Sequence, residues 1–388
     1  MSAELRMQPL GDFITLVSGN TPSKSNPSFW GGETPWVSAK DMGSFWISDS
    51  EDHLTPDGAS VASRLVPSGA VLLLTRGMTL HKRVPICRTA KPSTFNQDVK
   101  AVFPKAGISD RFLPYLLVGN HDRLHAKVDS AGHGTGRLNT EAILSFPVWV
   151  PGLKEQEGIA DIGEALDGRI TLLRKTNATL EAIAQALFKS WFVDFDPVRA
   201  KAEGRQPEAM DATTAALFPD SFEESELGLV PKGWTVKPVG DAVDCLGGGT
   251  PDTKEPSYWE PAEHCWTTPK DLSGLQSPVL LQTERRLSTL GLAKVSSGLL
   301  PAGTLLMSSR APIGYLAIAQ MPVAVNQGYI AIPPGGELSP LYMLFWCRQN
   351  MEAIKGRANG STFMEISKKA FRPIPALVPP AEVLDAFE

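Results

Sequence analysis

Basic and amide side chains recur at matched places in the two halves of this 388-residue sequence. Lys and Arg bind phosphate oxygens, and Asn and Gln form paired hydrogen bonds with base edges. Each matched residue could equally be a framework residue of a repeated fold, so both interpretations stay open here. The matched positions are Lys40 and Lys270, Arg76 and Arg310, Asn96 and Asn326, and Gln97 and Gln327.

Further polar residues lie where the two halves differ. The stretch 79–83 (TLHKR) faces 313–316 (IGYL), and the loop 131–137 faces 358–364. If two copies of one binder read two targets, the shared residues should hold the target's backbone and the divergent loops should read its sequence. The divergent candidates are His81, Lys82, Arg83, His133, Thr135, Arg137, Asn359, Ser361 and Thr362.

No catalytic or metal-binding pattern accompanies these residues. The turn 247–249 (GGG) lacks the GK[ST] of a phosphate-binding loop, and GxSxG, HExxH and paired acidic motifs are absent from the sequence. The cysteines, Cys87, Cys245, Cys265 and Cys347, form no CxxC pair. We therefore predict no catalytic residue, metal or cofactor in this chain.

Composition sets outer limits on the class of protein. Lys and Arg number 37 against 42 Asp and Glu, and the net charge of −5 argues against a chain that coats nucleic acid non-specifically. A net charge of this size is still compatible with local basic patches. The sequence has no run of 18 apolar residues and its start, MSAELRMQPL, has no apolar signal segment, which predicts a cytoplasmic protein without membrane contact.

An internal repeat must position the polar residues. Residues 9–12 (PLGD) match 238–241 (PVGD), and 67–77 (PSGAVLLLTRG) match 301–311 (PAGTLLMSSRA) at nearly constant spacing. In addition, 19–22 (GNTP) match 248–251 (GGTP). These ordered matches predict two copies of one domain, at 1–151 and 234–380.

Each copy reads as mixed α and β structure. Apolar runs bounded by Gly and Pro predict buried strands at 71–74 and 329–332. Helices are expected at 110–127 and 339–356, with Ser109 and Ser339 as N-caps.

Between the copies, residues 154–192 contain no proline and carry apolar residues every seven positions, which predicts a helix with a coiled-coil seam about 58 Å long. Such a seam should pack on a partner or on the same helix of a second copy. The helical segment is placed at 152–197 and an irregular linker at 198–233, with one short helix at 212–217. The residues predicted to bind a partner are Ile159, Leu166, Leu173, Leu180, Leu187 and Trp191.

Several motifs in this order resemble one family. They are the GNTP turn, the helix end at 186–197 (ALFKSWFVDFDP), the segment 225–228 (SELG) and the segment 230–234 (VPKGW). Together with the duplication they make the chain similar to the specificity subunits of Type I restriction-modification systems. The resemblance implies an α+β fold with two target-recognition domains, each reading one half of a bipartite, asymmetric site in double-stranded DNA, and a helix that sets the spacer.

The resemblance also implies partners. Two methyltransferase subunits would bring S-adenosylmethionine, and a motor-nuclease subunit would bring ATP hydrolysis and Mg. The family's second spacer helix is nearly absent, because only 381–388 follow the second repeat. Two alternatives remain: an enzyme that methylates or cuts DNA by itself, which the missing motifs disfavour, and a scaffold or decoy that only sequesters partners.

Overall fold

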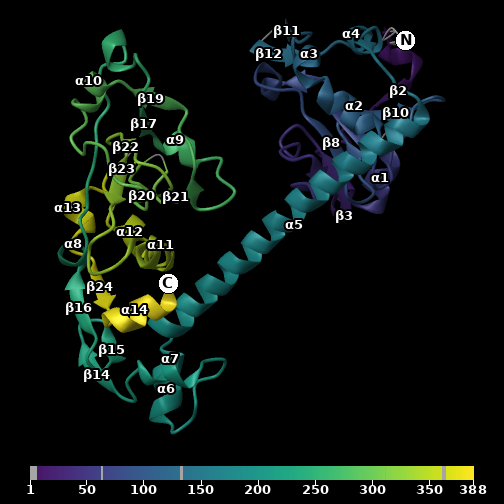
Figure 1. Ribbon diagram of the computed structural model, residues 1–388. Helices are drawn as coiled ribbons and strands as arrows, with labels where there is room; N and C mark the ends of the chain where they lie inside the picture. The colour runs from purple at the N-terminus through teal and green to yellow at the C-terminus, as the bar shows by residue number, and fades with distance from the viewer. Residues whose placement is uncertain (1–6, 63, 132–133, 311, 361–363) are drawn as a thin grey trace. The chain divides into compact units, whose positions relative to one another are not determined.

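The computed structural model describes residues 7–62, 64–131, 134–310, 312–360 and 364–388. The chain divides into a first unit, Met1–Leu172, and a second unit, Leu173–Glu388. Helix α5 (Leu153–Phe192) begins in the first unit and ends in the second (Figure 1). The predicted helix at 154–192 is therefore confirmed.

The first unit is built from short strands wrapped by short helices. Its main sheet has the order β2-β10-β6-β8-β4, and β5-β3-β9, β11-β12-β7 and β1-β13 form smaller sheets. The strands are β1 (Gln8–Pro9), β2 (Ile14–Ser18), β3 (Trp30–Val37), β4 (Trp46–Ile47), β5 (Asp52–Leu54), β6 (Val71–Leu74), β7 (Arg76–Gly77), β8 (Ile86–Thr89), β9 (Thr94–Phe95), β10 (Val99–Pro104), β11 (Asp129–Ala131), β12 (Thr135–Arg137) and β13 (Pro147–Val148). The helices are α1 (Pro56–Val61), η3 (Met78–His81), α2 (Leu113–Gly119), α3 (His121–His125) and α4 (Thr140–Leu144).

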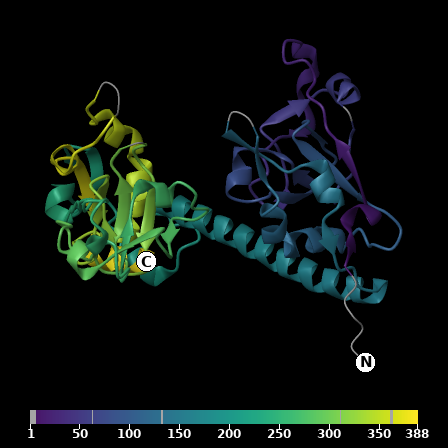
Figure 2. The ribbon, with the colours of Figure 1, turned by 90° about the horizontal axis from the view of Figure 1, so that it is seen from above.

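The second unit repeats this plan. Its sheets have the orders β23-β20-β21-β18, β19-β17-β22 and β16-β24, which reproduce β10-β6-β8-β4, β5-β3-β9 and β1-β13. The strands are β14 (Phe222–Ser225), β15 (Gly228–Pro231), β16 (Thr235–Pro238), β17 (His264–Thr267), β18 (Val279–Leu280), β19 (Arg285–Leu287), β20 (Leu305–Ser308), β21 (Leu316–Ala319), β22 (Ala324–Val325), β23 (Tyr329–Ile332) and β24 (Pro375–Val378). The helices are α6 (Asp196–Ala202), α7 (Ala212–Ala216), α8 (Val239–Ala242), α9 (Pro269–Leu272), α10 (Thr289–Leu292), α11 (Pro340–Gln349), α12 (Met351–Gly356), α13 (Lys368–Phe371) and α14 (Ala381–Phe387). Figure 2 shows both units from above.

Each unit has its own apolar core, and the central strands supply it. All side chains of β6 and β20 are buried, which explains their unbroken apolar sequences. The predicted strands at 71–74 and 329–332 coincide with β6 and β23. The predicted short helix at 212–217 is also confirmed, as α7, whose N-cap Asp211 accepts hydrogen bonds from the N–H groups of Thr213 and Thr214.

The helix expected at 110–127 is interrupted. It consists of α2 and α3, separated at Asn120, whose side-chain amide donates to the carbonyl of Leu116 at 2.9 Å. Asn350 separates α11 from α12 in the same way, with a 2.9 Å bond to the carbonyl of Trp346. Ser339 caps α11 as predicted, but Ser109 does not cap α2, because its hydroxyl donates to Glu157 of α5.

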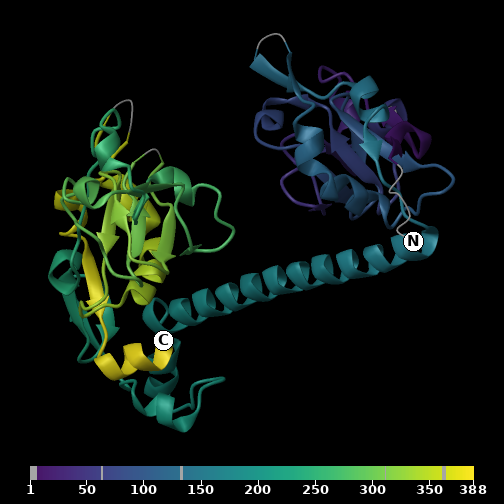
Figure 3. The same ribbon diagram turned by 45° about the horizontal axis from the view of Figure 1, so that its top comes forward.

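The segment 198–233 is not an irregular linker. Helix α5 ends at Phe192, and α6 begins four residues later with Pro197 in its first turn. An N–H group at this position has no partner within the helix, so the proline costs no helical hydrogen bond. The hairpin β14-β15 follows, and Phe218 and Val230 are buried in the core of the second unit. Helix α14 lies beside the end of α5 (Figure 3). The core also takes Phe188, Trp191 and Phe192 from α5, and the ring of Phe387 from α14 contacts all three.

Candidate nucleic-acid interface

In the first unit, strand pairing brings candidates from distant parts of the sequence together. Strand β7 pairs with β12, so that Arg76 and Arg137 are directly opposed, and both are exposed. The ring Nε2 of His81 lies 2.7 Å from the carbonyl oxygen of Gly134, which holds η3 against the same hairpin. Lys82 follows η3 and is exposed. This group forms one basic rim.

Glycine makes the close pairing in this rim feasible. A Cβ atom at Gly136 would lie 2.7 Å from the Cβ atom of Leu80, which is closer than carbon atoms can approach. Gly77 has a φ of +150°, a conformation that L side chains rarely adopt. Both positions therefore need glycine.

The turn at Asn96 and Gln97 lies next to this rim. The backbone N–H and hydroxyl of Thr75 donate to the carbonyl of Asp98 at 2.8 and 2.9 Å, which joins the turn to the strand that carries Arg76. The side chain of Asn96 is 9% exposed and accepts from the N–H of Asp98. Asn96 thus has a framework role. Gln97 is exposed, and its Oε1 accepts a 2.6 Å bond from the hydroxyl of Thr21.

The second unit builds the same turn from the same bonds. The hydroxyl of Thr250 donates to Gln327 at 2.6 Å, and Asn326 accepts from the N–H of Gly328 at 2.9 Å. The Gly-rich turns at Gly19 and Gly248 approach the strand end before each amide pair so closely that a Cβ atom would lie 2.1 and 1.6 Å from the carbonyl oxygens of Phe95 and Val325. The predicted turns are therefore part of this scaffold.

Lys40 and Lys270 also occupy equivalent positions, and both form ion pairs. Lys40 lies 2.8 Å from Glu51 and 3.2 Å from Asp52, and Lys270 lies 2.7 Å from Glu284. Hydrogen bonds to Glu51 and Glu284 raise the pKa of the two ammonium groups, so both remain charged. Exposed pairs of this kind contribute little to stability, so a phosphate can replace the carboxylates at small cost.

Arg83 differs from its neighbour Lys82. Its guanidinium donates to the carbonyl of Met42 at 2.8 Å, so it fastens the loop after β3 to the segment after η3. This contact gives Arg83 a structural role within the first unit.

In the second unit, Arg310 and Asn359 pair with Glu365. Glu365 forms backbone bridges to both residues, and its carboxylate lies 3.8 Å from the guanidinium of Arg310. The N–H of Leu138 donates to Thr75 and the N–H of Ile366 donates to Ser309, both at 2.9 Å. The equivalent of Arg137 is therefore Glu365, one residue beyond the match expected from sequence.

Thr135 lies on β12 opposite Ala131. His133, Ser361 and Thr362 lie outside the described residues.

A pair of tryptophans with a cation beside it occurs in each unit and was not among the predicted site residues. Trp30 and Trp36 meet edge to face at 5.2 Å, with the ammonium of Lys24 5.8 and 5.6 Å from the two rings. The second unit repeats this arrangement in Trp259 and Trp266, with Arg285 3.4 Å from the first ring. The tryptophans match in sequence, but the cations come from different elements, so the repeat alone could not identify them.

Ion pairs and a hydrogen bond join helix α5 to the rest of the first unit. Arg111 contacts Glu157, Asp161 and Glu164 at 2.6 to 2.7 Å, and this guanidinium holds the pKa of Glu164 below its usual range. The hydroxyl of Tyr115 donates to Asp167 at 2.7 Å.

The residues predicted to form the apolar seam of α5 are exposed, except for Trp191. Trp191 is only 9% exposed and meets Phe218 edge to face, so it is a core residue of the second unit and the predicted docking role does not fit it. The others are between 39% and 59% exposed, namely Ile159, Leu166, Leu173, Leu180 and Leu187.

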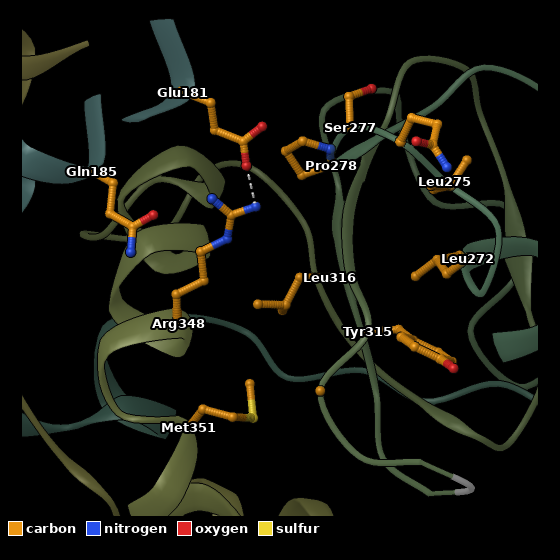
Figure 4. Close-up of a pocket in the computed structure, with 12 residues that line it drawn as sticks. Glu181, Gln185, Leu272, Leu275, Ser277, Pro278, Tyr315, Leu316, Arg348 and Met351 are labelled. Atoms are coloured by element: carbon orange, nitrogen blue, oxygen red, sulfur yellow. Dashed lines mark ion pairs between the residues drawn. The ribbon is translucent and has the colours of Figure 1, made fainter. Parts of the chain in front are cut away.

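A pocket of about 380 Å³ lies within the second unit, where α5 meets α11 (Figure 4). Arg348 and Glu181 form an ion pair at 2.5 Å on one side, and Tyr315, Leu316 and Met351 line it among others. The lining contains no nucleophile with an adjacent base, so it suggests no catalytic chemistry. Among the described residues, no group of His, Cys, Asp and Glu is suited to hold a metal ion. In the same part of the chain, no helix has the length and apolar character needed to cross a membrane.

Comparison with known proteins gives consistent matches. The family described as "Type I restriction modification DNA specificity domain" matches residues 4–182 and 231–383. The specificity subunit of the Type I restriction enzyme MjaIX from Methanocaldococcus jannaschii is 37% identical over 261 residues, which cover 66% of this chain and 55% of that protein. The specificity subunit of HindI from Haemophilus influenzae is 28% identical over 326 residues, or 71% of this chain and 69% of that protein.

Among solved structures, the S subunit of a Type I restriction-modification system from M. genitalium superposes with a TM-score of 0.52 at 12% identity, over 98% of this chain and 87% of that one. This match shows the fold. The chain spans about half the length of the M. jannaschii relative. With matching family segments over both units, the chain belongs to the Type I restriction modification DNA specificity domain family.

Proposed function

We propose that this chain is the DNA-recognition subunit of a Type I restriction-modification complex. Each unit reads one half of a bipartite, asymmetric site in double-stranded DNA. The observation that carries this proposal is the repeated scaffold: the bonds Thr21–Gln97 and Thr250–Gln327 recur unchanged, while the charged rims beside them differ. A shared scaffold with different outward residues is what two readers of different sequences need.

The chain supplies recognition, and its partners supply the chemistry. Methyltransferase subunits bring S-adenosylmethionine, and a motor-nuclease subunit brings ATP and Mg. The exposed apolar residues of the predicted seam on α5 are the surface for such a partner, because exposed apolar patches mark interaction sites. The recognition domains are 1–151 and 234–380, and α5 sets the spacer between the half-sites.

A domain exchange tests this proposal. The complex is reconstituted with its methyltransferase subunits, and its methylated motif is mapped by sequencing. Replacing residues 7–151 with the equivalent domain of another family member should change one half of the motif and preserve the other, because each unit has its own core. The matched control replaces 234–380 and should change the other half. Exchanges that alter both halves or neither would contradict modular reading, and methylation without any motif would contradict the proposal.

A further inference from the structure

The two units carry different charge pairs at one equivalent position. Backbone bonds from Leu138 to Thr75 and from Ile366 to Ser309, both 2.9 Å, fix this position in the same way in each unit. Arg76 opposes Arg137 in the first unit, and Arg310 opposes Glu365 in the second. The same backbone frame therefore presents two positive charges in one unit and a neutral pair in the other.

Both pairs are accessible to a ligand. Arg76 and Arg137 are exposed, and the side chains of Arg310 and Glu365 are 36% and 46% exposed. Each pair is also linked to the amide turn of its own unit, at 96–97 or at 326–327. The N–H of Thr75 donates to the carbonyl of Asp98, and the N–H of Ser309 donates to the carbonyl of Gly328. Each pair thus lies beside the turn that belongs to the proposed DNA-binding scaffold.

Two adjacent guanidinium groups repel each other, so they are poorly suited to converge on one base. Separate phosphates along a DNA strand satisfy both, and each such contact releases counterions. Arg76 and Arg137 therefore fit a backbone clamp.

The pair in the second unit fits a different target. With the guanidinium and carboxylate of Arg310 and Glu365 3.8 Å apart, the ion pair orients the arginine but is too long to be a hydrogen bond. Backbone bonds of 2.9 Å in both directions between Asn359 and Glu365 fix the main chain from which the carboxylate extends. An oriented guanidinium matches the O6 and N7 acceptors of guanine, and a carboxylate accepts from the N4 amino group of cytosine.

We propose that Arg310 and Glu365 read a G·C base pair in the second half-site, while Arg76 and Arg137 clamp phosphates beside the first. This inference rests on the proposed function and assigns the specificity-determining residues within it. The Arg310–Glu365 pair of the second unit is thereby a base reader, and the Arg76–Arg137 pair of the first unit is a backbone clamp.

The test measures binding of the reconstituted complex to its mapped site and to every single-base variant, at several salt concentrations. Arg310→Ala should relax discrimination at one G·C pair by about 5- to 150-fold, the range of one bidentate base contact. Glu365→Ala should relax discrimination at the same pair, because it removes the oxygens that accept from cytosine N4. Arg76→Ala and Arg137→Ala should leave discrimination unchanged and lower the salt slope by about one unit each. Thermal unfolding of each variant establishes that it is folded, and all four changes lie on the surface.

The outcomes distinguish a failure of this inference from a failure of the proposed function on which it rests. If Arg310→Ala weakens binding to all sequences equally, or if Glu365→Ala changes nothing, the base-reading assignment is overturned and DNA recognition still stands. If the unmodified complex selects no DNA sequence, both the inference and the proposed function are overturned.

Discussion

Lys82 and Arg83 are adjacent, yet the structure gives them different roles. Lys82 is exposed, whereas Arg83 donates to the carbonyl of Met42, whose side chain is buried. Sequence alone treats both as basic residues of one divergent loop. The difference arises because only the folded loop brings the carbonyl of Met42 within reach.

This contrast can be measured with single alanine substitutions. Lys82→Ala should lower the salt slope of DNA binding by about one unit if the residue contacts phosphate, with the free energy of unfolding unchanged. Arg83→Ala should lower the free energy of unfolding by about 1 kcal/mol, because a charge-assisted hydrogen bond is lost at an exposed site. Salt-dependent binding and chemical denaturation measure the two effects. Equal effects of the two substitutions on both quantities would contradict the assigned roles.

Residue types in the repeat predicted which positions recur, and that these positions bind DNA stays a prediction. The structure does bring Arg76 next to the turn at Asn96 and Gln97, through the bonds from Thr75 to Asp98. However, the side chain of Asn96 is used by the N–H of Asp98, and Lys40 is paired with Glu51 and Asp52. Such uses depend on tertiary contacts, which composition and spacing do not contain.

At the scale of elements, two glycines of α5 offer a matched comparison. A Cβ atom at Gly163 would lie 2.5 Å from the ring of Tyr115, whereas one at Gly168 would meet nothing within 4 Å. Gly168→Ala should stabilise the helix by up to about 1 kcal/mol, because alanine has the higher helix propensity. Gly163→Ala should destabilise the first unit by about 1 to 3 kcal/mol, because the ring of Tyr115 must move away from Asp167.

Denaturation curves of the two variants decide this prediction. Hydrogen exchange should show weaker protection of the amide hydrogens of α2 in Gly163→Ala but not in Gly168→Ala, because Tyr115 belongs to that helix. If both substitutions stabilise the protein alike, then the seam between α2 and α5 is not closely packed.

Local sequence patterns predicted elements well where one force dominates. The apolar runs of β6 and β23 and the seven-residue repeat of α5 each have a single strong signal. The segment 198–233 was misjudged because its prolines and glycines suggested a loop, although its scattered apolar residues complete a core built by distant elements. The break at Asn120 depends on one side-chain bond to a helix carbonyl, which propensity does not capture.

At the scale of the whole molecule, the proposed role of α5 in setting the spacer can be tested by lengthening the helix. Among the residues that the structure describes, the ion pairs and hydrogen bonds from α5 to other elements end at Asp167 and resume at Glu181, so Thr176 lies in a stretch that can accept an insertion. Four residues inserted there add about 6 Å and turn the helix by about 40°. Two base pairs of DNA add a similar length and about 70° of twist.

We therefore expect the insertion to lengthen the spacer of the methylated motif by about two base pairs. Sequencing of methylated DNA from the reconstituted complex gives the spacer directly. A control in which Thr176, Asn177 and Thr179 are replaced by alanine changes the sequence and preserves the length, so its spacer should be unchanged. Retained methylation with an unchanged spacer in the insertion variant would show that α5 does not set the distance between half-sites.

The aromatic cluster at the end of α5 also dictates an order of events during synthesis on the ribosome. The core of the first unit needs α5 only as far as its first turns, where Gln156 and Ala160 are buried, so this unit can close while the rest of the chain is still being translated. Phe188 and Phe192, in contrast, pack against Phe387 of α14, which is translated long after α5. The second unit therefore completes its core later than the first, and it cannot do so before α14 has left the ribosome.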